Sequence, residues 1–252
     1  MNKLDAVVIS DLHLGADLCC ARQLTRFLKD IQAGNIGTKE LILNGDVFDS
    51  WDFRRLKKHH WTSLSALRYL SKRITVTWVV GNHDGPANIV SHLIGVNVVE
   101  QYKIYSGEKA ILVLHGHQFD KFLVTHPIIT KVGDLIYRVL QKIDPSFRLA
   151  RAAKNSSKVY LRCTEKIADG AKARMRDAGC DLVCCGHTHN AEESTPYFNS
   201  GSWAELPCTY LAIQDGSVQL QQYGGPGSAE EDDEDEEQRA PAATQDEMVT
   251  AC

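Results

Sequence analysis

The chain contains 252 residues, of which 43% are hydrophobic, so it can bury one sizeable core. It has no apolar run near the length of about 18 residues that a membrane helix needs, and its first residues lack a signal-peptide pattern; we therefore expect a soluble cytoplasmic protein. The net charge of −4 hides an asymmetry, because residues 224–252 hold ten acids against one base and leave the rest of the chain mildly basic, which suits an anionic ligand.

Short β-branched or apolar runs predict buried strands at five places along the chain. These runs are residues 6–9, 41–43, 76–80, 111–114 and 182–185. Between the early runs, residues 20–33 and 57–73 have the spacing of helices. The alternation of strands and helices predicts an α/β fold.

Two later stretches predict antiparallel strands. Residues 96–105 carry Val96, Val98 and Val99 and then Tyr102, Ile104 and Tyr105 before a Gly. Residues 208–223 read as a hairpin that turns at Asp215-Gly216. The strand content is therefore mixed, which is compatible with two sheets packed face to face.

We divide the chain into one domain, residues 1–223, and an acidic tail, residues 224–252, whose composition predicts disorder. Inside the domain, residues 121–178 lack strand runs and are rich in Lys and Arg. We interpret this block as a basic helical cap insertion that contains the candidate substrate-binding residues. Its apolar residues fit either an acyl-chain groove or the ordinary buried stripe of helices.

Each predicted strand is followed by residue types that bind metals. These residues are Asp11 and His13, Asp46 and Asp49, Asn82, His83 and Asp84, His115 and His117, and His187 and His189. Ligands collect at the carboxyl ends of strands in an α/β sheet, so we expect the five clusters to converge. Two divalent cations held by such a set can clamp the attacking and leaving oxygens of a phosphoryl displacement. Imidazole with carboxylate suits Mn, Fe or Zn better than Mg or Ca.

In this order, the five clusters resemble the motif set of the calcineurin-like metallophosphoesterases, from about residue 5 to residue 223. The resemblance implies a β-sandwich flanked by helices and a centre of two divalent ions, with Mn²⁺ expected and Fe or Zn as alternatives. It implies a first ion bound by Asp11, His13 and His189, a bridging Asp46, and a second ion bound by Asn82, His115 and His187. It further implies that His83 protonates the leaving oxygen or steadies the phosphoryl group, and that Asp84 orients His83 through a hydrogen bond.

Three segments resemble the UDP-2,3-diacylglucosamine diphosphatases and their sister groups: residues 45–51, 115–120 and 199–203. In that family the position of residues 121–178 holds a lipid-covering insertion, which implies a nucleotide-diphospho-lipid substrate and a peripheral contact with the inner membrane. The best-known branch has Arg where this chain has His83, so the chain is closer to a sister group.

Other activities of the superfamily stay open: a cyclic-nucleotide or general phosphodiesterase, a phosphoprotein phosphatase, or a nuclease. A nuclease requires a basic groove with aromatic side chains on which bases can stack. Trp51 and Trp61 are candidates for such aromatic side chains. A non-catalytic scaffold would be expected to have lost metal ligands, and this sequence keeps the full set. The sequence does not indicate an oligomeric state.

Overall fold

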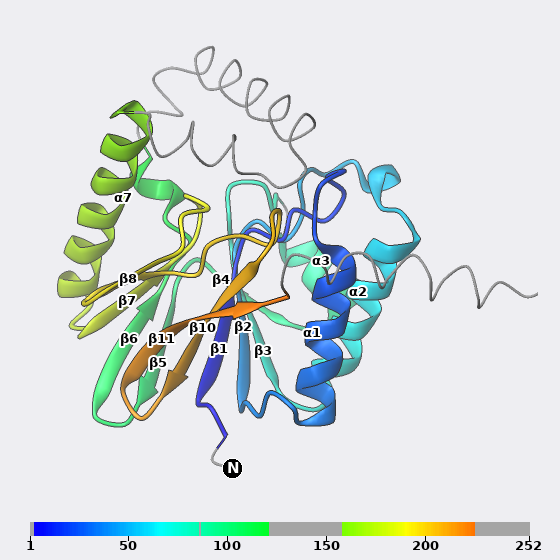
Figure 1. The fold of residues 1–252 in the computed structure, drawn as a ribbon, viewed down its shortest axis with the longest axis horizontal. Coiled ribbons are helices and arrows are strands. Elements are labelled where there is room, and N and C mark those ends of the chain that lie inside the picture. Colours follow the sequence, from blue (N-terminus) through cyan, green and yellow to red (C-terminus); the bar gives the residue numbers. More distant parts are fainter. Residues whose placement is uncertain (1–2, 86, 121–157, 225–252) are drawn as a thin grey trace, which may run out of the picture.

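A computed structural model describes residues 3–85, 87–120 and 158–224, which form two β-sheets packed face to face between layers of helices (Figure 1). The first sheet has the strand order β11-β10-β1-β2-β3-β4, and the second has the order β5-β6-β7-β9-β8. The strands of the first sheet are β1 (Ala6–Ile9), β2 (Glu40–Asn44), β3 (Thr75–Val79), β4 (Asn97–Val99), β10 (Cys208–Gln214) and β11 (Ser217–Tyr223). Those of the second are β5 (Tyr102–Ser106), β6 (Lys109–Val113), β7 (Leu182–Cys185), β8 (Glu192–Ser194) and β9 (Tyr197–Asn199).

Helices cover the outer face of each sheet, which confirms the expected sandwich flanked by helices (Figure 1). The helices are α1 (Ala21–Ala33), α2 (Lys58–Leu70), α3 (Ala87–Ile94) and α7 (Lys158–Asp177), with short 3₁₀ turns η1 (Phe53–Arg55) and η2 (His117–Phe119). The first three pack on the first sheet and α7 on the second. Helix α1 buries Leu24, Phe27 and Leu28 at helical spacing and ends at Gly34, whose left-handed backbone (φ 83°) forms the C-cap.

Alternation along the strands divides the interior into layers. In β1, Val7 and Ile9 pack against the α1 side of the first sheet, whereas Ala6 and Val8 pack between the two sheets. A third apolar cluster lies between the second sheet and α7. The central strands are covered on both faces, which explains their near-continuous apolar sequences.

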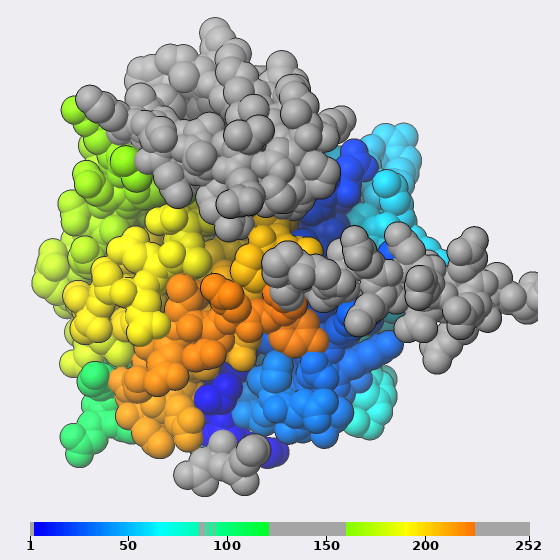
Figure 2. All heavy atoms as spheres, in the orientation of Figure 1, coloured from blue at the N-terminus to red at the C-terminus, as the bar shows by residue number. Residues whose placement is uncertain are grey.

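The prediction of antiparallel strands over residues 96–105 is correct for one half only. Strand β5 pairs antiparallel with β6 through a two-residue turn, but β4 pairs parallel with β3. The reason is helix α3, which the sequence reading missed and which carries the chain from β3 back to the start of β4 as a crossover. The predicted hairpin is confirmed, since β10 and β11 pair antiparallel across Asp215-Gly216. Its atoms lie on the face of the molecule that Figure 2 shows, in orange.

The cap and tail assignments fall mainly on residues 121–157 and 225–252, outside the described residues. Helix α7 occupies the last third of the basic block. Within the described ranges, no helix combines the length and apolarity needed to cross a membrane.

Candidate metal centre

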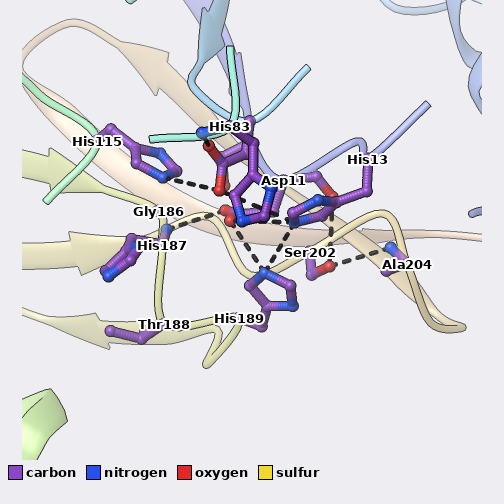
Figure 3. Close-up of polar contacts among 12 residues, drawn as sticks. Asp11, His13, His83, His115, Gly186, His187, Thr188, His189, Ser202 and Ala204 are labelled. Atoms are coloured by element: carbon purple, nitrogen blue, oxygen red, sulfur yellow. Dashed lines mark hydrogen bonds and ion pairs between the residues drawn. The ribbon is translucent and has the colours of Figure 1, made fainter. Parts of the chain in front are cut away.

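Two groups of side chains meet where the central strands end (Figure 3). Each group has one carboxylate and two imidazoles: Asp11 with His13 and His189, and Asp46 with His115 and His187. A third, more exposed set, Asp49 with His13 and His83, shares His13 with the first group. Within a group, the candidate ligand atoms all lie within 4.8 Å of one another. The structure thus brings together all the carboxylate and imidazole ligands predicted from the sequence. Asn82 is exposed in the loop after β3, between Gly81 and His83, which both contact Asp46.

His189 Nε2 is the centre of the first group. It lies 3.1 Å from Asp11 Oδ1 and 3.1 Å from His13 Nε2. Figure 3 shows the three side chains converging, Asp11 and His13 from the loop after β1 and His189 from the loop after β7. Two imidazole nitrogens and a carboxylate oxygen directed at one point form a donor set that suits Mn, Fe or Zn.

His115 is the fully buried member of the second group. Its Nδ1 lies 2.7 Å from the carbonyl oxygen of Asn44, which only accepts, so Nδ1 carries a proton. Its Nε2 faces Asp46 Oδ2 at 3.3 Å. The same Asp46 oxygen lies 4.0 Å from His13 Nε2, so the Asp46 carboxylate stands between the two groups.

The backbone is strained at five of the six residues in these groups. Asp11, His13, Asp46, His187 and His189 all have positive φ, between 45° and 67°. Elsewhere in the described ranges, Asp215 in the hairpin turn is the one other non-glycine residue with positive φ. Strain of this kind costs of order 1–3 kcal/mol per residue and gathers at functional sites, where the surroundings impose it.

Asp84 supplies part of that support, in a way that differs from the expected hydrogen bond to His83. Its buried carboxylate accepts backbone N–H groups from Asp46 (2.9 Å), Val47 (2.7 Å) and Gly81 (2.8 Å), and the indole N–H of Trp78 (3.0 Å). Both oxygens of the Asp84 carboxylate accept hydrogen bonds from these donors. The carboxylate therefore fixes the loop around Asp46 instead of orienting His83. Gly81 permits this packing, because a Cβ there would lie 2.2 Å from Asp46 Oδ1.

Asp84→Ala is expected to lower the free energy of unfolding of the metal-free protein by at least about 3 kcal/mol, because it leaves several buried donors without an acceptor. Chemical denaturation measures the change. Asp181→Ala is the matched control: exposed Asp181 accepts one backbone N–H, from Ala110, and its loss should cost about 1 kcal/mol. Equal losses in the two variants would contradict the structural function of Asp84.

His83 is held by a different acceptor. Its Nδ1 lies 2.9 Å from the carbonyl oxygen of Asp49, and its backbone N–H donates to Asp46 Oδ1 at 2.9 Å. The His83 and His13 ring centroids are 5.2 Å apart. The His83 ring therefore borders the first group. Because His83 is exposed, the ring is also accessible to a ligand from solvent.

Residues 199–203 support the site through hydrogen bonds to the loops that carry the candidate ligands. Asn199 Nδ2 donates to the carbonyl of Gly186 (2.8 Å) and to Thr188 Oγ1 (3.1 Å) in the loop that carries His187 and His189. The backbone N–H of Trp203 donates to the carbonyl of Asp11 at 3.1 Å. In the sequence, this segment was identified only by resemblance. In the structure it hydrogen-bonds both to the loop that carries His189 and to the backbone of Asp11, and so it connects the two loops that supply the first group.

The two carboxylates stay ionised in this setting. Burial alone would raise the pKa of Asp11, but the imidazoles of His189 and His115 hold it well below the usual range. The pKa of Asp46 is likewise lowered by His115 and His13 against the effect of burial. Burial and the nearby His189 lower the pKa of His13 to about 4, so the His13 imidazole is neutral at pH 7.

His115 behaves in the opposite way, which predicts pH-dependent metal uptake. Burial would lower its pKa, but the Asp46 carboxylate raises the pKa to about 9. A proton must therefore leave His115 when it binds a metal, and affinity should rise with pH up to about 9, by as much as roughly tenfold per unit. Calorimetric Mn²⁺ titrations at pH 7, in buffers that differ in ionisation enthalpy, should show proton release. Uptake without released protons would contradict the prediction.

Two buried polar atoms of the site face other candidate ligands without forming a hydrogen bond, an arrangement that fits metal ions. Within the described residues, Asp11 Oδ1 and His115 Nε2 are buried and form no hydrogen bond. Both atoms belong to the candidate donor sets, and buried polar groups that lack a hydrogen-bond partner are costly in a folded protein. Divalent ions would satisfy these atoms together with the neighbouring imidazoles.

Paired carboxylate–histidine groups at the strand ends of a sandwich define a protein suited to hold divalent metals. The family model described as calcineurin-like phosphoesterase matches residues 5–191, and the chain belongs to this family.

Solved structures that match the chain include a Streptococcus pneumoniae TIGR4 protein described as a predicted phosphoesterase (16% identity, TM-score 0.40, covering 88% of this chain and 90% of that one). A Vps29 single mutant from Entamoeba histolytica is 18% identical, with TM-score 0.44 and coverage of 86% and 97%. A hypothetical protein from Pyrococcus horikoshii OT3 is 9% identical, with TM-score 0.49 and coverage of 94% of both chains. Comparison with curated proteins gave no match.

Proposed function

We propose that the protein is a two-metal hydrolase of phosphate esters or diphosphates. The observation that carries this proposal is the position of Asp46 between two carboxylate–imidazole groups, with exposed His83 beside them. Asp11, His13 and His189 would hold one ion, and Asn82, His115 and His187 the other, with Mn²⁺ as the preferred metal. When bound, the two ions supply Lewis-acid activation of the phosphoryl oxygens and of the attacking water.

The residues of the chain prepare the site for that chemistry. Asp46 and Asp11 provide negative charge where two cations must be brought close together. His83 is oriented by the Asp49 carbonyl through Nδ1, so its Nε2 is the nitrogen available to protonate a leaving oxygen. Asp84 acts on the reaction indirectly, by fixing the loop that carries Asp46.

For the substrate, we propose UDP-2,3-diacylglucosamine or a related nucleotide-diphospho-lipid, reached by a cytoplasmic protein at the surface of the inner membrane. The support is the sequence resemblance of residues 45–51, 115–120 and 199–203, and the basic character of residues 121–178.

The test is an activity panel on protein stripped of metal and reloaded with Mn²⁺. The panel contains bis-p-nitrophenyl phosphate, UDP-2,3-diacylglucosamine, a cyclic nucleotide and single-stranded DNA. Release of UMP from the lipid supports the proposed substrate. Cleavage of only the other diesters keeps the two-metal hydrolase and discards the lipid. Absence of both bound metal and turnover would overturn the proposed function.

A further inference from the structure

The loop that carries His187 and His189 is held by two side chains outside the metal groups. Asp120 Oδ2 lies 3.0 Å from His187 Nε2, and the two side chains are 13% and 8% exposed. The Tyr160 hydroxyl donates to the carbonyl oxygen of Thr188, between the two histidines, at 2.7 Å. Asp120 and Tyr160 lie 40 positions apart in the sequence, yet both reach the same three-residue loop.

The Asp120 contact determines which nitrogen of His187 can bind a metal. A neutral imidazole has one N–H and one lone pair, and a carboxylate accepts only from the protonated nitrogen. With Nε2–H directed at Asp120, the lone pair is on Nδ1. His115 has the reverse arrangement, since its Nδ1 faces the carbonyl of Asn44 and its Nε2 faces Asp46. The two imidazoles of the second group therefore present different nitrogens.

Both supports are anchored to the same helix. Tyr160 belongs to the first turn of α7. Asp120 follows η2, and its backbone N–H donates to the carbonyl of His117 at 3.0 Å. Helix α7 packs tightly on η2 at Gly170, where an added Cβ would come within 2.6 Å of the Phe119 ring. The position of Asp120 is thus set by packing, as an effective support for a ligand requires.

We propose that Asp120 is a positioning residue that fixes His187 as an Nδ1 ligand, and that Tyr160 is a positioning residue that fixes the loop between His187 and His189. This inference rests on the proposed function, because it assigns a purpose to these contacts in metal binding. It distinguishes the two residues: Asp120 supports one ligand of the second ion, whereas Tyr160 supports a loop with a ligand for each ion.

The test is metal binding by the full chain, measured by Mn²⁺ titration with metal content determined at each free concentration, and by the absorption spectrum of the Co²⁺-loaded protein. Asp120→Ala should bind the first ion as the wild type does and the second about 10- to 100-fold more weakly, the range typical for loss of a ligand's hydrogen-bond partner. Asp120→Asn keeps an uncharged acceptor and should bind the second ion more tightly than Asp120→Ala. Tyr160→Phe should lower the affinity for both ions and alter the absorption spectrum of the Co²⁺-loaded protein.

Asp181→Asn, which changes a carboxylate remote from the centre, is the control and should bind both ions normally. If Asp120→Ala binds both ions with wild-type affinity and an unchanged Co²⁺ spectrum, the inference is overturned while the proposed function stands. If the wild type itself binds no metal, the proposed function fails first, so the two failures are distinguishable.

Discussion

Asp46→Asn is expected to lower phosphoester hydrolysis by more than about 100-fold, beyond the 10- to 100-fold effect of residues that only support a ligand. Asp46 Oδ2 is the atom that stands between the groups, 3.3 Å from His115 Nε2 and 4.0 Å from His13 Nε2. Asn removes the negative charge that would hold two cations close together. In place of a carboxylate oxygen, the His115 and His13 imidazoles then face either the amide NH₂ or the uncharged amide oxygen of the Asn side chain. The variant should therefore bind fewer ions than the wild type at the same free Mn²⁺.

The Asn substitution separates this loss from a loss of folding. Asn tolerates the left-handed backbone that Asp46 adopts (φ 53°), and its carbonyl oxygen can still accept the backbone N–H of His83. The metal-free variant should still unfold in one cooperative thermal transition, which shows that it folds. The measurements are kcat on bis-p-nitrophenyl phosphate and metal content by mass spectrometry. Wild-type turnover with a full metal complement would show that Asp46 does not bridge the ions.

The sequence was sufficient to predict where the candidate side chains would meet, because strand position and residue type are both local. Each apolar run became a buried strand, and Asp11, Asp46 and His187 follow their strands at the same end of the sandwich. Parallel pairing of β1 with β2, and of β6 with β7, brings these ends together.

The supports around the site were harder to predict, because they depend on contacts between distant parts of the chain. The donors to Asp84 come from two loops and from Trp78 in β3, and the residue adjacent to it in sequence, His83, is held by Asp49 instead. A motif gives residue types in order but not the direction of each side chain. Helix α3 was missed for a related reason: it is only two turns long, and its apolar residues merge with the next strand-like run.

The left-handed residues explain why the motifs contain so many Asp and His residues beside Gly. Positive φ is tolerated best by Gly and, among other residues, by Asn, Asp and His. Sharp turns of this kind at strand ends let one short loop direct two side chains, such as those of His187 and His189, into different groups. Local strain and ligand geometry are therefore two consequences of the same turns.

His83→Ala should reduce kcat by about 100- to 10,000-fold on a diester with an alkoxide leaving group, the range for loss of a general acid. On bis-p-nitrophenyl phosphate the loss should be less than about tenfold, because p-nitrophenolate departs with little help from a proton. Metal content should remain that of the wild type, since His83 is bound to the Asp49 carbonyl and is not among the residues we assign as ligands. The comparison of the two substrates isolates proton transfer from metal binding.

His92→Ala provides the matched control, because His92 is an exposed histidine on α3, the helix that follows the His83 loop. It should leave both rates unchanged. If His83→Ala loses equal factors on the two substrates while keeping its metals, His83 steadies the phosphoryl group in the transition state and does not protonate the leaving oxygen. The exposed ring beside the first group permits both actions, but only proton donation depends on the basicity of the leaving group, so the ratio of the two losses decides between them.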